Sequence, residues 1–198
     1  MTAGVISQPA TRQKGEIRLI NAVPCAVLVP PILAARRYVS PRSRPITPDE
    51  SESRRIAYAL KRGAENGVAA RELVRLLPPD LPTITLVPVP ASTGSIKANL
   101  ILAKAIAAEY GPQVRVVSSI RRVVPVESSC ARRRRGLPGL TAADHKFVRV
   151  GGWFALPLFL VDNVATTGAT LAAARHALGF GTGLVFADAS PIYQPPAK

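Results

Sequence analysis

The chain has 198 residues, enough for one domain with its own hydrophobic core. Hydrophobic residues make up 47% and charged residues 19%, a balance that excludes an intrinsically disordered protein. The two cysteines, Cys25 and Cys130, lie far apart and show no CxxC or Cys/His spacing. This argues against a disulfide framework and a structural zinc site, so we expect a cytoplasmic protein.

The formal net charge of +14 favours polyanionic partners, either phosphate-rich small molecules or nucleic acid. An arginine-rich composition on a solvated surface would give the same charge, and both interpretations stay open. Positive residues are spread along the chain, and only 132–135 form a dense block. The start of the chain lacks the apolar segment of a signal peptide, and prolines interrupt the apolar stretch 19–35, so we expect no membrane association.

The first part of the chain, 1–50, is rich in proline, and we expect it to form a small N-terminal hood with an edge strand in 17–29. Residues 47–50, Thr-Pro-Asp-Glu, are typical of a helix start, with a capping residue, proline at the first helical position and acids in the first turn. Asn66-Gly67 breaks this first helix, and apolar spacing predicts a second helix over 69–77.

Strands and helices then alternate, which predicts an α/β domain over 51–190 with a central, mostly parallel sheet flanked by helices. The segment 121–145 is polar, arginine-rich and too long for an ordinary connection, so we expect a functional flap or a disordered excursion. Residues 191–198 form a C-terminal tail. The expected strands are 84–89, 114–120, 156–161 and 184–189, and the expected helices are 95–110 and 170–178.

The stretch 158–178, LFLVDNVATTGATLAAARHAL, carries the strongest functional signal. Asp162 and Asn163 follow an apolar strand, at the end where open α/β sheets bind ligands. Gly168 lets the backbone approach a phosphate, whose oxygens the neighbouring hydroxyls and the amides of the next helix can bind. An acid at this point suits ribose hydroxyls or the water shell of Mg²⁺. The expected phosphate-binding residues are Val164, Ala165, Thr166, Thr167, Gly168, Ala169 and Thr170.

This pattern resembles the signature with which type I phosphoribosyltransferases bind 5-phosphoribosyl-1-pyrophosphate (PRPP). The similarity covers 158–170: four apolar residues, two acids or near-acids, an apolar pair, Thr-Thr-Gly, a small residue and Thr170. It implies the type I phosphoribosyltransferase fold, catalytic roles for Asp162 and Asn163, and Mg²⁺ held by Asp162 through water. The family usually has a second acid at the position of Asn163. Asparagine keeps the hydrogen-bonding ability but loses the charge, so PRPP binding without turnover stays open.

Over 56–189 the chain is also similar to ComF-type, amidophosphoribosyltransferase-like proteins. ITLVPVPAS resembles a strand of that family whose following loop contacts pyrophosphate, and Asn99 matches an asparagine in the next helix. SIRRVVPVESSCARRRRG resembles the arginine-led flap, without its usual glutamine; the zinc-binding cysteine cluster that often precedes the domain is not found in this sequence. The implied pyrophosphate loop is Val89, Pro90, Ala91, Ser92, Thr93, Gly94 and Ser95, and the implied flap cations are Arg121, Arg122, Arg132 and Arg133.

The resemblance implies a Mg²⁺-dependent enzyme that transfers the 5-phosphoribosyl group to a nitrogenous base or another acceptor and releases pyrophosphate. Relatives commonly form dimers, so a homodimer is possible here. The alternatives are a non-catalytic PRPP sensor or a DNA- or RNA-binding protein on the same fold, or an enzyme that modifies bases in nucleic acid. His145 borders the flap and could act as an acid or base, but a loop histidine without a visible partner is more often inert.

Overall fold

A computed structural model describes residues 32–40, 44–151 and 154–189. The edge strand that we expected in 17–29 and the tail 191–198 lie outside the described residues.

The centre of the fold is a parallel sheet of five strands in the order β1-β7-β6-β2-β3. Their bounds are β1 (Ile32–Arg37), β2 (Ile84–Pro88), β3 (Val114–Val116), β6 (Leu158–Ala165) and β7 (Thr182–Asp188). The expected α/β class with a parallel central sheet is therefore confirmed. Residues 32–37, which belong to the expected hood, form an edge strand of this sheet by pairing with β7.

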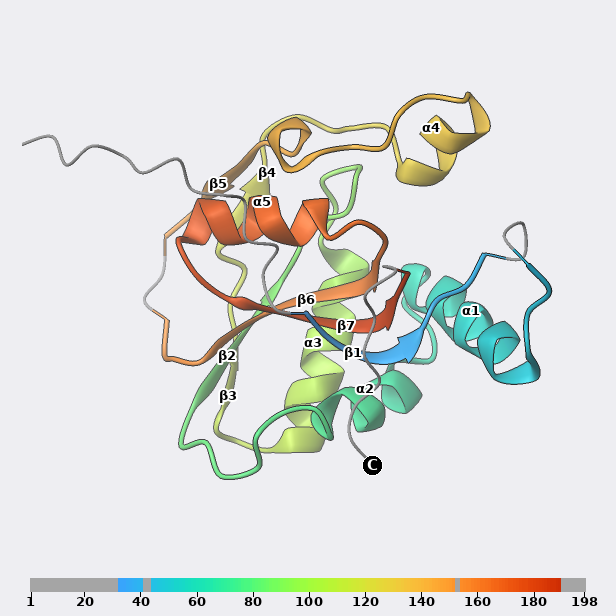
Figure 1. The fold of residues 1–198 in the computed structure, drawn as a ribbon. Helices are drawn as coiled ribbons and strands as arrows, with labels where there is room; N and C mark the ends of the chain where they lie inside the picture. The colour runs from blue at the N-terminus through green and yellow to red at the C-terminus, as the bar shows by residue number, and fades with distance from the viewer. Residues whose placement is uncertain (1–31, 41–43, 152–153, 190–198) are drawn as a thin grey trace, which may run out of the picture.

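Helices cover both faces of the sheet, as Figure 1 shows. The first face carries α1 (Pro48–Lys61), α2 (Asn66–Val74) and α3 (Lys97–Tyr110), and the second carries α5 (Ala169–Leu178). This arrangement explains why β2 and the first half of β6 are mainly apolar, because parallel strands between two helical layers are buried on both sides.

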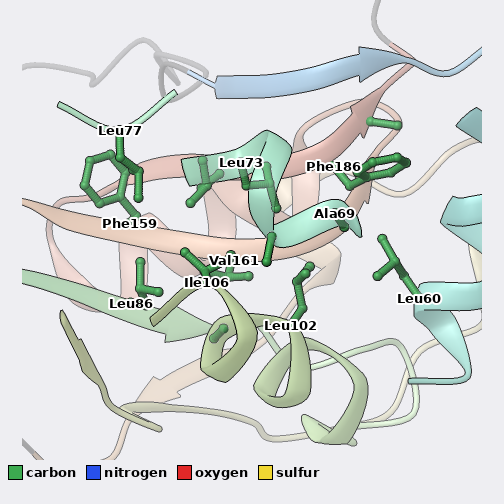
Figure 2. Close-up of a cluster of buried hydrophobic side chains, with 14 of the residues drawn as sticks. Leu60, Ala69, Leu73, Leu77, Leu86, Leu102, Ile106, Phe159, Val161 and Phe186 are labelled. Atoms are coloured by element: carbon green, nitrogen blue, oxygen red, sulfur yellow. The ribbon is translucent and has the colours of Figure 1, made fainter. Parts of the chain in front are cut away.

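The two cores lie on opposite faces of the sheet. Figure 2 shows the larger one, in which Leu102 and Ile106 of α3 and Leu73 of α2 pack near Phe159 and Val161 of β6. The smaller core joins the alternate residues of β6 to the apolar side of α5: Leu158, Leu160, Leu171, Ala174 and Leu178. Because β6 contributes to both cores, the strand that carries the candidate site is held rigidly from each side.

Helix α1 begins as the sequence predicts. Thr47 caps it: its hydroxyl accepts a hydrogen bond from the Glu50 amide at 3.3 Å, and the Glu50 carboxylate accepts one from the Thr47 amide at 3.0 Å. Pro48 occupies the first helical position. Helix α2 begins at Asn66, so residues 66–67, which we interpreted as a break, form its first turn.

The single strand expected over 114–120 is wrong. β3 ends at Val116, and the chain then leaves the sheet through two serines to form a second, antiparallel pair of strands, β4 (Ile120–Arg122) and β5 (Phe147–Arg149). Ser119 is fully buried. A polar pair inside an apolar run was the signal that the strand is divided.

The arginine-rich segment between β4 and β5 has more regular structure than we expected. It contains a short helix α4 (Ser129–Arg134) and a 3-10 helix η1 (Ala142–Asp144). The β4–β5 pair and η1 contact α5, and Figure 1 shows β4, β5 and α4 beyond α5, away from the main sheet. The segment thus covers the side of the molecule on which α5 begins.

The chain leaves the neighbouring strands β2 and β6 toward opposite edges of the sheet. β2 and β6 are neighbours, but the chain passes from β2 through α3 to β3 on one side and from β6 through α5 to β7 on the other. Their carboxyl ends therefore form a topological switch point, where the following loops diverge and open sheets bind ligands. Both sequence motifs follow these two strands.

No helix in the described part of the chain has the length and apolar character needed to cross a bilayer.

Candidate functional site

The turn between β6 and α5 forms one wall of a polar pocket at the switch point. Its backbone bends at Gly168, whose φ of +74° lies in the left-handed region that favours glycine. The expected phosphate-binding residues line this pocket together with Asp162, whereas Asn163 is not part of the lining. Residues from other segments complete it, and the full lining consists of Asp162, 164–171, His145, Ser129 and Leu140.

Backbone amides at this turn are available to a ligand. In the described part of the chain, no acceptor takes a hydrogen bond from the amides of Thr167, Gly168 or Thr170. Helix α5 has ten residues, and its amino-terminal end adds a partial positive charge at the same place. The Thr166, Thr167 and Thr170 side chains also line the pocket. Together these donors suit an anion with several oxygens.

Asp162 supplies the carboxylate of the pocket. It lies within β6, which continues to Ala165, rather than after the strand as we expected. Its Oδ1 accepts hydrogen bonds from the Asn163 amide at 2.7 Å and the Asn99 side chain at 3.0 Å, and Oδ2 accepts none from the described residues. Burial raises the pKa of Asp162 to about 6, although these two hydrogen bonds and the nearby Lys61 and Arg122 lower it. The carboxyl therefore takes up a proton at a higher pH than an exposed aspartate does.

Asn99 fixes the position of Asp162. It lies in the first turn of α3, is 5% exposed, and donates a second hydrogen bond to the Val89 carbonyl at 2.7 Å. One side chain thus joins α3, the end of β2 and the middle of β6. The resemblance had identified this asparagine without assigning it a role.

Arg122, one of the implied flap cations, is a buried residue of β4. It is 6% exposed, and its Nε donates to the Ala91 carbonyl at 2.8 Å while Nη2 donates to the Pro90 carbonyl at 3.3 Å. Its guanidinium also lies 4.3 Å from the centroid of the Phe147 ring. Burial lowers the pKa of Arg122, and Asp162 opposes this shift. The residue connects the β4–β5 pair to the loop after β2.

His145 is the pocket residue that sequence reasoning undervalued. It is 8% exposed, and its Nδ1 lies 3.0 Å from Nη1 of Arg122 while its Nε2 lies 3.5 Å from Oγ1 of Thr170. Burial and Arg122 lower the pKa of His145, and Asp144 opposes them. These partners come from β4 and α5, so their proximity is visible only in the folded chain.

The loop 89–95 lies beside the pocket rather than in its wall. It follows β2, and Arg122 ties it to the β4–β5 pair. The amides of Ala91 and Gly94 are used inside the loop, bonding to the carbonyls of Ser95 and Ala91. Within the described residues, the amides of Ser92 and Thr93 bond to no acceptor. The backbone donors left for a pyrophosphate are therefore fewer than we expected.

The arginines of the flap divide into two kinds. Arg132 is partly buried and donates to the Pro138 carbonyl at 3.0 Å, which stabilises the turn after α4. Arg121 and Arg133 are exposed, and their side chains make no hydrogen bond or ion pair with the described residues. Beside His145, the flap contributes Ser129 and Leu140 to the lining of the pocket, and the sequence did not single out these two residues. The length of the segment and its resemblance to an arginine-led flap were the indications that it would reach the site.

The pocket fits a magnesium ion only if a ligand brings most of the coordinating oxygens. Among the described residues, no three His, Cys, Asp or Glu side chains gather to hold a metal ion. Asp162 offers one oxygen, Oδ2, that no described residue uses. Mg²⁺ commonly binds through one or two carboxylates together with water and substrate phosphates. Asp162 fits that mode.

We compared the sequence with models of known protein families and with curated proteins, and neither comparison gave a match. A functional assignment therefore depends on the pocket and on the sequence motif that forms it.

Proposed function

We propose that the protein is a Mg²⁺-dependent phosphoribosyltransferase, which transfers the 5-phosphoribosyl group of PRPP to a nitrogenous base or a related acceptor. One observation carries the proposal: Asp162 and the turn 164–170 line the same pocket at the switch point of a parallel sheet. The signature resemblance concerns this segment. The pocket thus combines a carboxylate for ribose hydroxyls with a phosphate-binding turn.

In this proposal the 5′-phosphate of PRPP binds the amides of Thr167, Gly168 and Thr170 and the neighbouring hydroxyls. The ribose hydroxyls bind Asp162, whose free Oδ2 accepts their hydrogen bonds or holds a magnesium-bound water. The pyrophosphate lies toward the amides of Ser92 and Thr93, after the neighbouring strand. This assignment uses backbone donors and a carboxylate oxygen that have no hydrogen-bond partner among the described residues.

The reaction breaks the bond between C1 of the ribose and the pyrophosphate oxygen and forms a bond from C1 to the acceptor nitrogen, with inversion. The bonding electrons leave with the pyrophosphate, and the acceptor nitrogen releases a proton to solvent. When bound, Mg²⁺ offsets the negative charge that develops on the pyrophosphate. The residues of the chain hold the ribose and the phosphates in line, and no covalent protein intermediate is needed.

The test is a pyrophosphate-release assay with PRPP, Mg²⁺ and a panel of nitrogenous bases. We expect the wild type to release pyrophosphate with at least one base and Asp162→Asn to lose most of this activity. Asp80→Asn is the control, because Asp80 is exposed and precedes the amino end of β2, at the opposite edge of the sheet. Unchanged activity in Asp162→Asn would contradict the assignment of Asp162.

A second candidate function is a non-catalytic PRPP sensor or a DNA- or RNA-binding protein, including one that modifies bases within nucleic acid. Two observations favour it: Asn163 replaces an acid that the resembled family usually has, and the net charge is +14. Calorimetric binding of PRPP without turnover on any acceptor would support the sensor. Binding to DNA or RNA that weakens steeply with salt would support a nucleic-acid-binding protein or a base-modifying enzyme.

A further inference from the structure

We infer that His145 is a phosphate-binding residue, whose Nε2–H donates a hydrogen bond to a phosphomonoester held by the turn 166–170. The inference rests on the proposed function, which assigns this turn to the 5′-phosphate. It adds a ligand-binding residue from outside the signature segment, at the junction of η1 and β5.

Arg122 determines which nitrogen of His145 carries the proton. A guanidinium can only donate hydrogen bonds, so the 3.0 Å contact between Nη1 and Nδ1 requires Nδ1 to be an acceptor. The imidazole is then neutral, and its proton is on Nε2. Burial beside a guanidinium also disfavours the charged imidazolium.

The protonated nitrogen lies at the pocket. His145 is a lining residue, and its Nε2 is 3.5 Å from Oγ1 of Thr170, at the long limit for a hydrogen bond. A hydrogen bond to Thr170 at this distance is weak, so the Nε2–H can bind an oxygen that enters between the histidine and the amino-terminal end of α5.

The orientation of the ring is fixed by groups from several elements. Phe147 of β5 lies parallel to the imidazole with a centroid distance of 6.2 Å, Arg122 of β4 binds Nδ1, and Thr170 of α5 lies next to Nε2. The charged groups that act on His145 are Arg122 and Asp144 of η1, and Asp162 of β6 lines the same pocket. A ring held in this way is organised before the ligand binds.

The chemistry of these donors points to a phosphomonoester. The turn offers hydroxyls, backbone amides and a helix amino terminus, all of which favour an anion. His145 adds a neutral donor with a buried guanidinium directly behind it, which polarises the Nε2–H toward negative charge. A terminal phosphate presents enough oxygens to use the turn and the histidine together.

Two substitutions separate the phosphate-binding role of His145 from its packing role. In His145→Asn the side-chain oxygen replaces Nδ1, so the acceptor for Arg122 is kept and the donor at the pocket is lost. In His145→Gln the side-chain amide reaches toward the place of Nε2, so a donor at the pocket is kept. His176→Asn is the control, since His176 is an exposed residue of α5. The probe is ribose 5-phosphate, titrated into the full chain by calorimetry, with ribose as the ligand without phosphate.

We expect ribose 5-phosphate to bind His145→Asn about tenfold or more weakly than the wild type, as for a lost hydrogen bond to a charged group. His145→Gln should recover most of the affinity, and His176→Asn should bind normally. Long-range ¹H–¹⁵N NMR should show His145 protonated at Nε2 and unprotonated at Nδ1, and binding should shift the Nε2 resonance. Normal binding by His145→Asn, equal losses in the Asn and Gln variants, or a proton on Nδ1 would each overturn the inference.

The same experiments distinguish this inference from the proposed function. His145-dependent binding of ribose 5-phosphate without pyrophosphate release on any acceptor would support the inference and contradict the proposed enzyme. Pyrophosphate release together with normal binding of ribose 5-phosphate by His145→Asn would support the proposed enzyme and contradict the inference. If the wild type does not bind ribose 5-phosphate, the inference is overturned, and the pyrophosphate assay decides the proposed function separately.

Discussion

At the scale of single residues, Asp162 combines two demands that oppose each other. Burial raises the pKa of its carboxyl to about 6. In the proposed function, however, the ribose hydroxyls or a magnesium-bound water need the ionised carboxylate. The hydrogen bonds from Asn99 and the Asn163 amide favour that ionised form. The balance between burial and these two donors therefore sets the pH at which Asp162 is ionised, as the proposed function requires.

Replacing Asp162 with asparagine should change how stability depends on pH. Between about pH 4 and pH 6 the folded protein keeps a proton that the unfolded chain has released, so the stability contributed by this group falls as pH rises through that window. The difference between a pKa of about 6 and an ordinary value of about 4 corresponds to at most about 3 kcal/mol. Urea unfolding at pH 4 and pH 7 should show Asp162→Asn gaining stability relative to the wild type at the higher pH. An equal difference at both pH values would mean that the carboxyl titrates normally.

Removing the Asn99 side chain should destabilise the site, because Asn99 bonds both the Val89 carbonyl and Asp162. Asn99→Ala leaves the Val89 carbonyl without its buried donor, and we expect a loss of about 1–3 kcal/mol in the free energy of unfolding. The change also removes a donor that stabilises the Asp162 carboxylate, so the pKa of Asp162 should rise further above about 6. ¹³C NMR titration of the Asp162 carboxyl measures this shift. A pKa that stays the same or falls would show that Asn99 does not position the carboxylate.

At the scale of elements, the turn between β6 and α5 depends on a conformation that only glycine adopts easily. Gly168 has a φ of +74°, and it is the residue that precedes the first turn of α5. Gly168→Ala should cost about 1 kcal/mol of stability and should also weaken binding of ribose 5-phosphate, because the turn would relax away from its anion-binding geometry. Gly139→Ala is the matched control, since a Cβ at Gly139 meets no atom within 4 Å and its φ is not in the left-handed region. Equal effects of the two substitutions on binding would argue against a special role for the turn.

Elements with a strong local signal were predictable from the sequence. The start of α1 follows from a cap, a proline and two acids, and the central strands follow from apolar runs. The turn after β6 was identified because its residues are contiguous. The contact between His145 and Arg122 was not predictable, because the two residues lie on either side of a long flap and meet only when β4 pairs with β5. Periodicity also failed at 114–120, where two serines end β3 and tertiary contacts start β4.

At the scale of the whole molecule, Arg122 connects the β4–β5 pair to the central sheet. The β4–β5 pair has three residues in each strand, too few to be stable alone, and Arg122 bonds it to the carbonyls that follow β2. The same side chain holds His145 at the pocket. The Arg122 guanidinium therefore contributes both to the position of His145 and to the attachment of the second sheet, beside the packing of Ile120 and Phe147 against the smaller core.

Arg122→Met should weaken the attachment of the β4–β5 pair to the central sheet. The substitution keeps an apolar side chain but removes the guanidinium, which lies over Phe147 and donates to the carbonyls of Pro90 and Ala91, so we expect a loss of about 2–4 kcal/mol in the free energy of unfolding. Amide hydrogen exchange should accelerate most in β4 and β5 and least in β6 and β7, because local opening follows the loss of the contacts that attach a segment. Arg121→Met is the control, as Arg121 is an exposed neighbour on the same strand. Uniform acceleration across both sheets, or equal effects of the two substitutions, would show that the sheets are held together by other contacts.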